Sequence, residues 1–348
     1  MPSQRAGSEK IRAFLVANVA DHPKDVVSFT ASQFDISRPA VLRHMHQLIQ
    51  DGQVGVEGRT RDRAYRLLPI VDKIFPYTVW PGLQEDIVWR DDVRPLLANL
   101  PENVVHICEY GLTEMLQNVV DHSEAISASV GLTYTLASVR LVVSDNGVGI
   151  FNKIQRALNL PDPRDSILEL AKGKVTTDPN HHTGEGVFFT SRMFDDFVMM
   201  SGSLFFSHTR PVGKLEDWLL EANGKITEGT YIRMSISTRS QRTTRKVFDQ
   251  FTTQDGEFGF TRTVVPVTLA RVGEENLVSR SQAKRLLVRF ERFKEIVLDF
   301  RGIKTIGLAF GDEVFRVFAG SHPEVQIFPI NTRKQVREVI ARAQSKEL

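Results

Sequence analysis

The chain has 348 residues, 41% of them hydrophobic and 25% charged, and this length predicts two or three folded domains. The formal net charge of +2 excludes attraction of nucleic acid by the whole surface and leaves only a local patch for that role. Cys108 is the single cysteine, which excludes an intrachain disulfide framework and a cysteine-based metal cluster. No apolar run approaches a transmembrane span and the first residues lack the core of a signal peptide, so we expect a cytoplasmic protein without membrane contact.

Residues 1–70 are expected to form a small helical domain. Apolar residues recur at helical spacing over 11–19, and the apolar cluster at 26–29 predicts a short extended piece. The pattern over 30–36 then predicts a short helix.

A longer helix is expected after Ser37, which is a typical capping residue, with Pro39 in the first turn. The alternation of apolar and polar residues over 54–68, around a turn at Gly58, predicts a two-stranded hairpin.

The order helix, helix, helix, hairpin resembles a winged helix-turn-helix. The resemblance implies DNA binding, with two groups of contact residues. Those facing the major groove would be Ser37, Arg38, Arg43 and His44. Those on the wing, near phosphates, would be Arg59, Arg61 and Arg63. Many winged helices instead serve as protein-docking or dimerisation modules, and the sequence leaves that alternative open.

Residues 71–100 carry three prolines, with Trp80 and Trp89 between them. A disordered linker is poor in aromatic residues, so we expect a packed helical and aromatic connector here.

The most informative stretch is 101–245. A helical pattern from Val104 through Val120 contains Glu114, Asn118 and Asp121, and spacings of four and three place these side chains on one helical face.

Further along, the strand within 138–150 ends in Asp145-Asn146-Gly147-Val148-Gly149, a tight turn that lets backbone approach a ligand. A loop over 172–186 then leads into a helix at about Gly186, whose amides could bind phosphate. Gly229-Thr230 opens a final strand over 230–236.

In this order, the motifs E-x-x-x-N-x-x-D, D-x-G-x-G, G-E-G and G-T are similar to those of the GHKL superfamily of ATP-binding domains. The resemblance implies an α/β sandwich that binds ATP and Mg²⁺, with Asn118 as the metal ligand. Asp145 would accept the adenine amine and Thr230 would support the base. The other nucleotide-binding residues implied are Asp121, Gly147, Gly149, Lys172, Lys174, Thr183, Gly184, Glu185 and Gly186.

Glu114 lies where the superfamily keeps its general base. It would polarise either a water, in an ATPase, or a serine or threonine hydroxyl, in a protein kinase. Lys172 and Lys174 would neutralise phosphate or remain solvated loop lysines. His181 and His182 are not expected to bind metal, because adjacent side chains diverge and no third ligand stands at zinc-like spacing.

The alternation of strand and helix patterns over residues 255–348 predicts a small α/β domain. Helices are expected over 279–293, 308–319 and 335–343, with strands over 295–307 and 325–330. The domain resembles STAS-like modules of the DUF4325 type. Ala309 lies near the position of the phosphorylated serine of related modules and has no hydroxyl, with Thr305 as a weak substitute, so we expect a docking surface for a protein partner.

The sequence therefore predicts a multidomain α/β protein with a winged helix, a GHKL domain and a STAS-like domain. Its expected function is that of a bacterial regulator which couples the nucleotide state to DNA or partner binding, with ATP hydrolysis or phosphoryl transfer to serine or threonine. The alternative is a nucleotide-sensing transcription factor without significant turnover. A homodimer is expected by analogy only.

Overall fold

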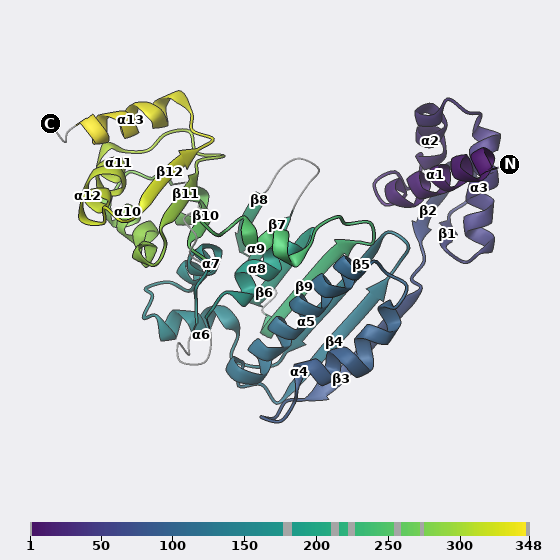
Figure 1. Cartoon of the computed structure of the whole chain (residues 1–348), viewed down its shortest axis with the longest axis horizontal. Coiled ribbons are helices and arrows are strands. Elements are labelled where there is room, and N and C mark those ends of the chain that lie inside the picture. Colours follow the sequence, from purple (N-terminus) through teal and green to yellow (C-terminus); the bar gives the residue numbers. More distant parts are fainter. Residues whose placement is uncertain are drawn as a thin grey trace.

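We describe the protein from a computed structural model that covers residues 2–176, 183–209, 216–221, 227–253, 259–271 and 275–345. These residues form a helical N-terminal unit, a central domain on a seven-stranded sheet and a C-terminal domain on a three-stranded sheet (Figure 1). The N-terminal unit and the C-terminal domain lie at opposite ends of an elongated molecule, and the central domain lies between them.

The N-terminal unit contains α1 (Pro2–Asn18), α2 (Val26–Phe34), α3 (Arg38–Gln50) and a hairpin of β1 (Val54–Glu57) and β2 (Ala64–Leu67), with the turn η1 (Thr60–Asp62) between the strands. It has a core of its own, in which Leu15 and Met45 are fully buried. The expectation of an extended piece at 26–29 is wrong. These residues begin α2, because Val26 and Thr30 are buried one helical turn apart.

Local side chains set the turn between α2 and α3. Asp35 ends α2 in the left-handed conformation, with φ of 50°. The Ser37 hydroxyl accepts a hydrogen bond from the Ala40 amide at 3.4 Å and so caps α3, with Pro39 in the first turn as predicted.

The seven strands of the central sheet are all antiparallel to their neighbours, in the order β3-β4-β5-β9-β6-β7-β8. Their bounds are β3 (Val71–Thr78), β4 (Ser127–Tyr134), β5 (Ser138–Asp145), β6 (Asp196–Gly202), β7 (Leu204–Thr209), β8 (Glu216–Glu221) and β9 (Thr227–Ser237). Because β9 lies between β5 and β6, the start of β9 is beside the end of β5, with Tyr231 opposite Ser144.

Residues 71–100 are part of the central domain and not a separate connector. β3 pairs with β4 along its whole length as the edge strand of the sheet, a position that tolerates Pro76. The helical segments α4 (Glu85–Val88), η2 (Trp89–Val93) and η3 (Arg94–Leu97) follow. They contact the long helix that comes next, and Trp89 and Val93 are buried in the central core.

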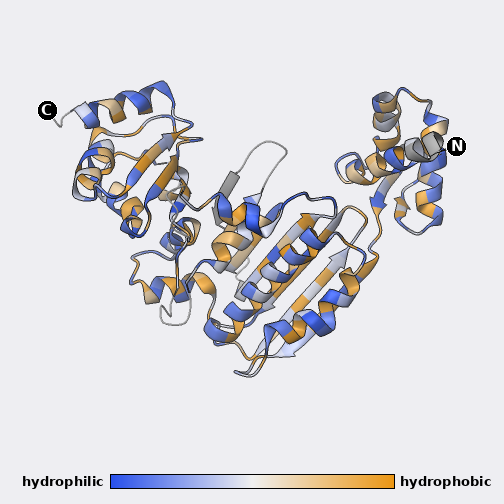
Figure 2. Cartoon of the chain, viewed as in Figure 1, coloured by the Kyte–Doolittle hydropathy of each residue, from blue (hydrophilic) through white to orange (hydrophobic). Residues whose placement is uncertain are grey.

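Helices cover one face of the central sheet. They are α5 (Glu102–His122), α6 (Ile150–Ala157) and α8 (Gly186–Met193), while α7 (Pro163–Lys172) packs on α6 and α8. Val139, Leu141 and Val143 of β5 are buried and alternate with less buried residues. Figure 2 shows that hydrophobic and hydrophilic residues are both present along the strands of the sheet. The short helix α9 (Thr244–Asp249) follows the sheet and packs against α8.

The C-terminal domain has a parallel sheet of β10 (Arg262–Pro266), β11 (Glu295–Asp299) and β12 (Gln326–Ile330). Its helical segments are η4 (Val267–Ala270), α10 (Arg280–Leu287), η5 (Phe290–Arg292), α11 (Leu308–Asp312), η6 (Glu313–Phe318), α12 (Ala319–Ser321) and α13 (Lys334–Gln344). The strand expected over 295–307 is shorter than predicted. It ends at Asp299 because a turn follows in which Gly302 has φ of 78°.

The central and C-terminal domains share one hydrophobic core. A cluster of phenylalanine rings lies where they meet: Phe188, Phe189, Phe248, Phe251, Phe260 and Phe293. The ring centroids of Phe188 and Phe260 are 4.4 Å apart, and those of Phe260 and Phe293 are 5.3 Å apart. This cluster joins α8 to the C-terminal domain.

Among the residues that the structure describes, no helix combines the length and the apolar character that crossing a membrane requires.

Candidate functional site

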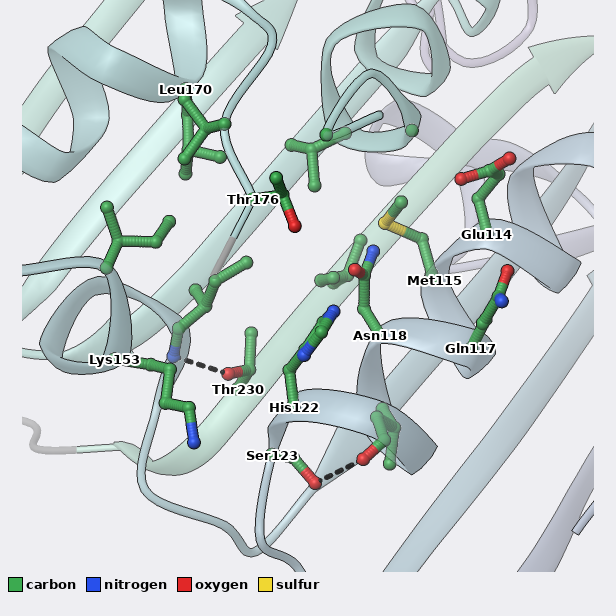
Figure 3. Close-up of a pocket in the computed structure, with 18 of the residues that line it drawn as sticks. Glu114, Met115, Gln117, Asn118, His122, Ser123, Lys153, Leu170, Thr176 and Thr230 are labelled. Carbon is green, nitrogen blue, oxygen red and sulfur yellow. Dashed lines mark hydrogen bonds between the residues drawn. The ribbon is translucent and has the colours of Figure 1, made fainter. Parts of the chain in front are cut away.

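A cavity of about 280 Å³ lies in the central domain beneath the helical layer. Its walls come from α5, the end of β5, the first turn of α6, α7, the segments on either side of residues 177–182, and β9. Figure 3 shows how side chains from these elements converge on it. Segments that are far apart in the sequence therefore build one site.

The face of α5 that lines the cavity carries Glu114, Asn118 and His122, one helical turn apart. Asn118 and His122 project from α5 toward the side of the cavity that carries Thr176 and Thr230 (Figure 3). Glu114 and Asn118 thus lie on the face that the sequence predicted.

Asp121 is a different case, because it is exposed and lies outside the cavity lining. At this end of α5 the residues that face the cavity are His122 and Ser123 instead.

Asp145, the last residue of β5, holds its carboxylate at the cavity by two backbone hydrogen bonds. The Gly147 amide donates to it at 2.8 Å, and the Thr230 amide also donates. Burial raises the pKa of the Asp145 carboxyl, and the two amides partly oppose this change by stabilising the ionised form. The carboxylate is therefore oriented and partly desolvated.

Close contacts require glycine at two of the positions that follow Asp145. Gly149 has φ of 81°, and a side chain there would overlap the Ser201 hydroxyl. A side chain on Gly147 would overlap the Ser123 carbonyl. Gly149 lines the cavity, but Gly147 does not, because it packs against the end of α5 and only orients Asp145.

Thr230 connects β9 to the cavity wall. Its Oγ1 accepts a hydrogen bond from the Ile150 amide at 3.0 Å, drawn in Figure 3. Gly229, with φ of 66°, accepts a hydrogen bond from the Ser201 hydroxyl at 2.9 Å through its carbonyl. These contacts fix the start of β9 against the first turn of α6.

The segment Thr183, Gly184, Glu185 and Gly186 lines the cavity and leads into α8. Gly184 has φ of 71°, and its carbonyl accepts a hydrogen bond from the Val175 amide at 2.9 Å. A side chain on Gly186 would overlap the Glu114 carboxylate, so α8 begins directly against that carboxylate.

Two more titratable groups lie near Glu114. Burial raises the pKa of Tyr110, with smaller contributions from the charges of Glu114 and Glu185 and from a hydrogen bond to the Glu114 side chain. Burial also raises the pKa of Glu185, which the charge of Lys174 opposes.

Lys172 and Lys174, expected either to neutralise phosphate or to be solvated loop lysines, do not line the cavity. The Lys172 side chain is 1% exposed, and its Nζ donates to Glu169 at 2.5 Å and to the Val288 carbonyl at 2.9 Å. The Lys174 Nζ donates to the Arg292 carbonyl at 3.0 Å. Both lysines face the C-terminal domain, because α7 packs between it and α8.

Residues 177–182, which include His181 and His182, lie outside the described residues. Within the described part of the chain, no group of three or more histidine, cysteine, aspartate or glutamate side chains could hold a metal ion.

Sequence reasoning did not select several residues that line the cavity: Gln117, Lys153, Ile154, Leu170, Val175 and Thr176. Lys153 pairs with Glu124 at 2.5 Å. The helical period of α5 could have identified His122, which lies one turn beyond Asn118. The apolar residues carry no local signal, because only the fold brings them to the site.

The basic residues expected to contact DNA lie on the N-terminal unit. Arg38, Arg43, Arg59 and Arg63 are exposed, and Ser37 caps α3. His44 is half-buried, and burial followed by the charges of Arg12 and Arg43 lowers its pKa. Arg61 lies in η1. Arg12 of α1 and Arg43 of α3 therefore both lie close to His44.

A profile for the STAS-like domain of unknown function (DUF4325) matches residues 282–337. The matched residues run from α10 into α13, so this part of the C-terminal domain is similar to a STAS-like domain. A search of curated proteins found no match.

Proposed function

We propose that the central domain is a GHKL-type domain that binds ATP with Mg²⁺, and that the chain is a regulator which transmits this nucleotide state to its flanking parts. One observation carries the proposal. Glu114, Asn118, Asp145, Gly186 and Thr230 come from separate segments and line a single cavity. The order of motifs in the sequence suggested this set, and the fold supports it by bringing its members together.

The cavity has the chemistry that an adenine nucleotide requires. The Asp145 carboxylate can accept a hydrogen bond from an exocyclic amine, while Ile150, Ile154 and Ile232 provide an apolar surface for a base. The turn at Gly149 keeps the backbone free of a side chain where a ligand would approach.

The other end of the cavity suits phosphate and a cation. The backbone amides at the start of α8, from Gly186 onward, can donate to phosphate oxygens with the aid of the helix dipole. The amide oxygen of Asn118 is a suitable ligand for Mg²⁺, with phosphate oxygens completing the coordination. The residues present therefore fit both ATP and the metal.

ATP would supply the phosphoryl group, and Glu114 is the candidate general base. Its carboxylate lies against Gly186, near the helix start that would hold the phosphates. From there Glu114 would accept a proton from an attacking water or from a serine or threonine hydroxyl. The Tyr110 hydrogen bond would orient the carboxylate.

The second candidate is a nucleotide sensor without turnover, and one observation favours it. Glu114 already has two contacts, the hydrogen bond with Tyr110 and the approach to Gly186. In a sensor, these contacts would give Glu114 a purely structural role at the start of α8.

The flanking parts would provide the output of the regulator. The N-terminal unit has the element order of a winged helix-turn-helix, and Arg12 and Arg43, which lie close to His44, would attract DNA phosphates. The STAS-like domain would bind a protein partner. A homodimer remains part of the proposal by analogy with both kinds of domain.

A single-turnover assay tests the proposal. Full-length protein is incubated with γ-labelled ATP and Mg²⁺, and free phosphate and labelled protein are followed separately. An ATPase releases phosphate, a kinase labels protein, and in both cases Glu114→Ala abolishes the reaction while ATP still binds. Glu102→Ala, in the exposed first turn of the same helix, is the matched control and should react as wild type.

Binding of ATP to the wild type without either product supports the sensor. The absence of ATP binding to the wild type contradicts both candidates. Asn118→Ala should lose the dependence on Mg²⁺ in every case in which ATP binds.

A further inference from the structure

We propose that Arg289 of the C-terminal domain is a positioning residue for the cavity of the central domain, because it fixes the backbone that leads from α7 into the cavity wall. The inference rests on the proposed function in one respect, namely that the ligand of the cavity is a nucleotide. The contacts that carry it belong to the described residues and do not depend on the nature of the ligand.

The backbone between α7 and the cavity has an unusual conformation. Gly173 and Lys174 both have positive φ, at 87° and 56°. This region is unfavourable for a lysine, so surrounding contacts must hold Lys174 in it. The next two residues, Val175 and Thr176, line the cavity. The conformation of Lys174 therefore sets where this wall of the cavity lies.

Arg289 holds Lys174 from the other domain. Its Nη2 donates to the Lys174 carbonyl, and its Nη1 donates to the Glu169 carboxylate at 3.3 Å. The Arg289 side chain is 12% exposed, and its planar guanidinium orients both acceptors at once. One side chain of the C-terminal domain thus ties the last turn of α7 to the second residue after this helix.

Neighbouring residues of the C-terminal domain reinforce this contact. The Lys174 Nζ donates to the Arg292 carbonyl at 3.0 Å and lies 4.9 Å from the centroid of the Phe293 ring. A side chain on Gly173 would overlap the Phe260 ring. The C-terminal domain therefore surrounds the segment 173–174 on several sides.

Removal of the Arg289 side chain is a clean perturbation of this arrangement. Glu169 retains its ion pair with Lys172 at 2.5 Å, so the variant leaves no buried carboxylate without a partner. The Lys174 carbonyl would lose its strongest donor, because the contact that remains, from Arg292 Nη1, is 3.4 Å long. We expect Val175 and Thr176 to become less ordered while the fold is kept.

The test compares wild type, Arg289→Ala and Arg289→Lys as full-length proteins. It measures ATP affinity and dissociation rate with Mg²⁺, and hydrogen exchange of the Val175 amide without nucleotide. Arg289→Ala should bind ATP about tenfold more weakly, mainly through faster dissociation, and should exchange the Val175 amide faster. Arg289→Lys should recover part of both effects, because an ammonium can bind one of the two acceptors.

Lys284→Ala is the matched control, since Lys284 is on α10 and its side chain is 70% exposed. It should behave as wild type in both measurements. An ATP affinity of Arg289→Ala within twofold of wild type, with unchanged exchange at Val175, overturns the proposal.

If the wild type binds no ATP, the proposed function fails, and exchange then decides the positioning role separately. Faster exchange in Arg289→Ala supports the role for another ligand of the cavity, and unchanged exchange overturns it. A thermal unfolding curve for each variant identifies any that fails to fold, and Arg289→Lys then provides the comparison.

Discussion

The two ends of the molecule are joined to the central domain in different ways. The N-terminal unit has its own core, against which Leu136 and Ala137 of the central domain pack, and an exposed hydrogen bond joins Arg239 to the Ala13 carbonyl at 3.0 Å. The C-terminal domain shares its core with the central domain and adds buried ion pairs such as Arg289 with Glu169. A change at the cavity can therefore reach the C-terminal domain through packed side chains, while the N-terminal unit can move more independently.

The largest expected effect is on the core that the two domains share. Phe260 is 4% exposed and its ring contacts Phe188, Phe251 and Phe293. Phe260→Ala should lower the free energy of unfolding by about 3–5 kcal/mol. Urea denaturation followed in the central and C-terminal domains should show one common transition that moves to lower urea. Two separate transitions, of which only one moves to lower urea, would show that the two domains do not unfold as one unit.

The matching change at the other end is Leu15→Ala, which removes a fully buried side chain from the separate N-terminal core. It should lower the stability of the N-terminal unit by about 2–5 kcal/mol. The unfolding transition of the other two domains and the ATP affinity should stay as in the wild type. A parallel loss of ATP affinity would show that the N-terminal unit is coupled to the cavity as tightly as the C-terminal domain.

A smaller effect is expected for the surface of the N-terminal unit. Replacement of the exposed Arg59 and Arg63 by alanine should weaken DNA binding about tenfold and reduce the salt dependence by about two counterions. Fluorescence anisotropy of a labelled duplex at several salt concentrations measures both quantities. Arg245→Ala is the control, because Arg245 lies on α9 and its side chain is 90% exposed. An equal loss of DNA affinity in the control variant would show that Arg59 and Arg63 have no specific role in DNA binding.

The smallest expected effect is a pH dependence that arises at the cavity. Because burial raises the pKa of Asp145 in the folded protein, its contribution to stability is fully present below the ordinary pKa of 3.8 and is lost as the pH rises through the raised value. The stability of the wild type relative to Asp145→Asn should therefore decrease with rising pH over this range. Urea denaturation at a series of pH values measures it. The change in stability should appear in the common transition of the central and C-terminal domains. A change in the transition of the N-terminal unit would contradict the independence of that unit from the cavity.

Sequence patterns predicted those elements whose structure is determined by the residues of the element itself. The period of α5 placed Glu114 and Asn118 on one face, and the alternation in β5 predicted its buried side. β3 was missed because an edge strand with a proline pairs only with a distant strand, β4. The direction of Lys172 was missed for a similar reason, since its acceptor, the Val288 carbonyl, belongs to another domain. Contacts between distant segments decide such features, and a local pattern does not contain them.

Titration of the full-length protein with ATP, with and without Mg²⁺, tests whether the cavity of the central domain is a nucleotide site. We expect one site per chain with Mg²⁺-dependent affinity. Asp145→Asn should abolish binding, Asn118→Ala should remove the Mg²⁺ dependence, and Asp86→Asn, at an exposed carboxylate of α4, should change neither. No binding by the wild type, or the same binding by wild type and Asp145→Asn, would contradict the account.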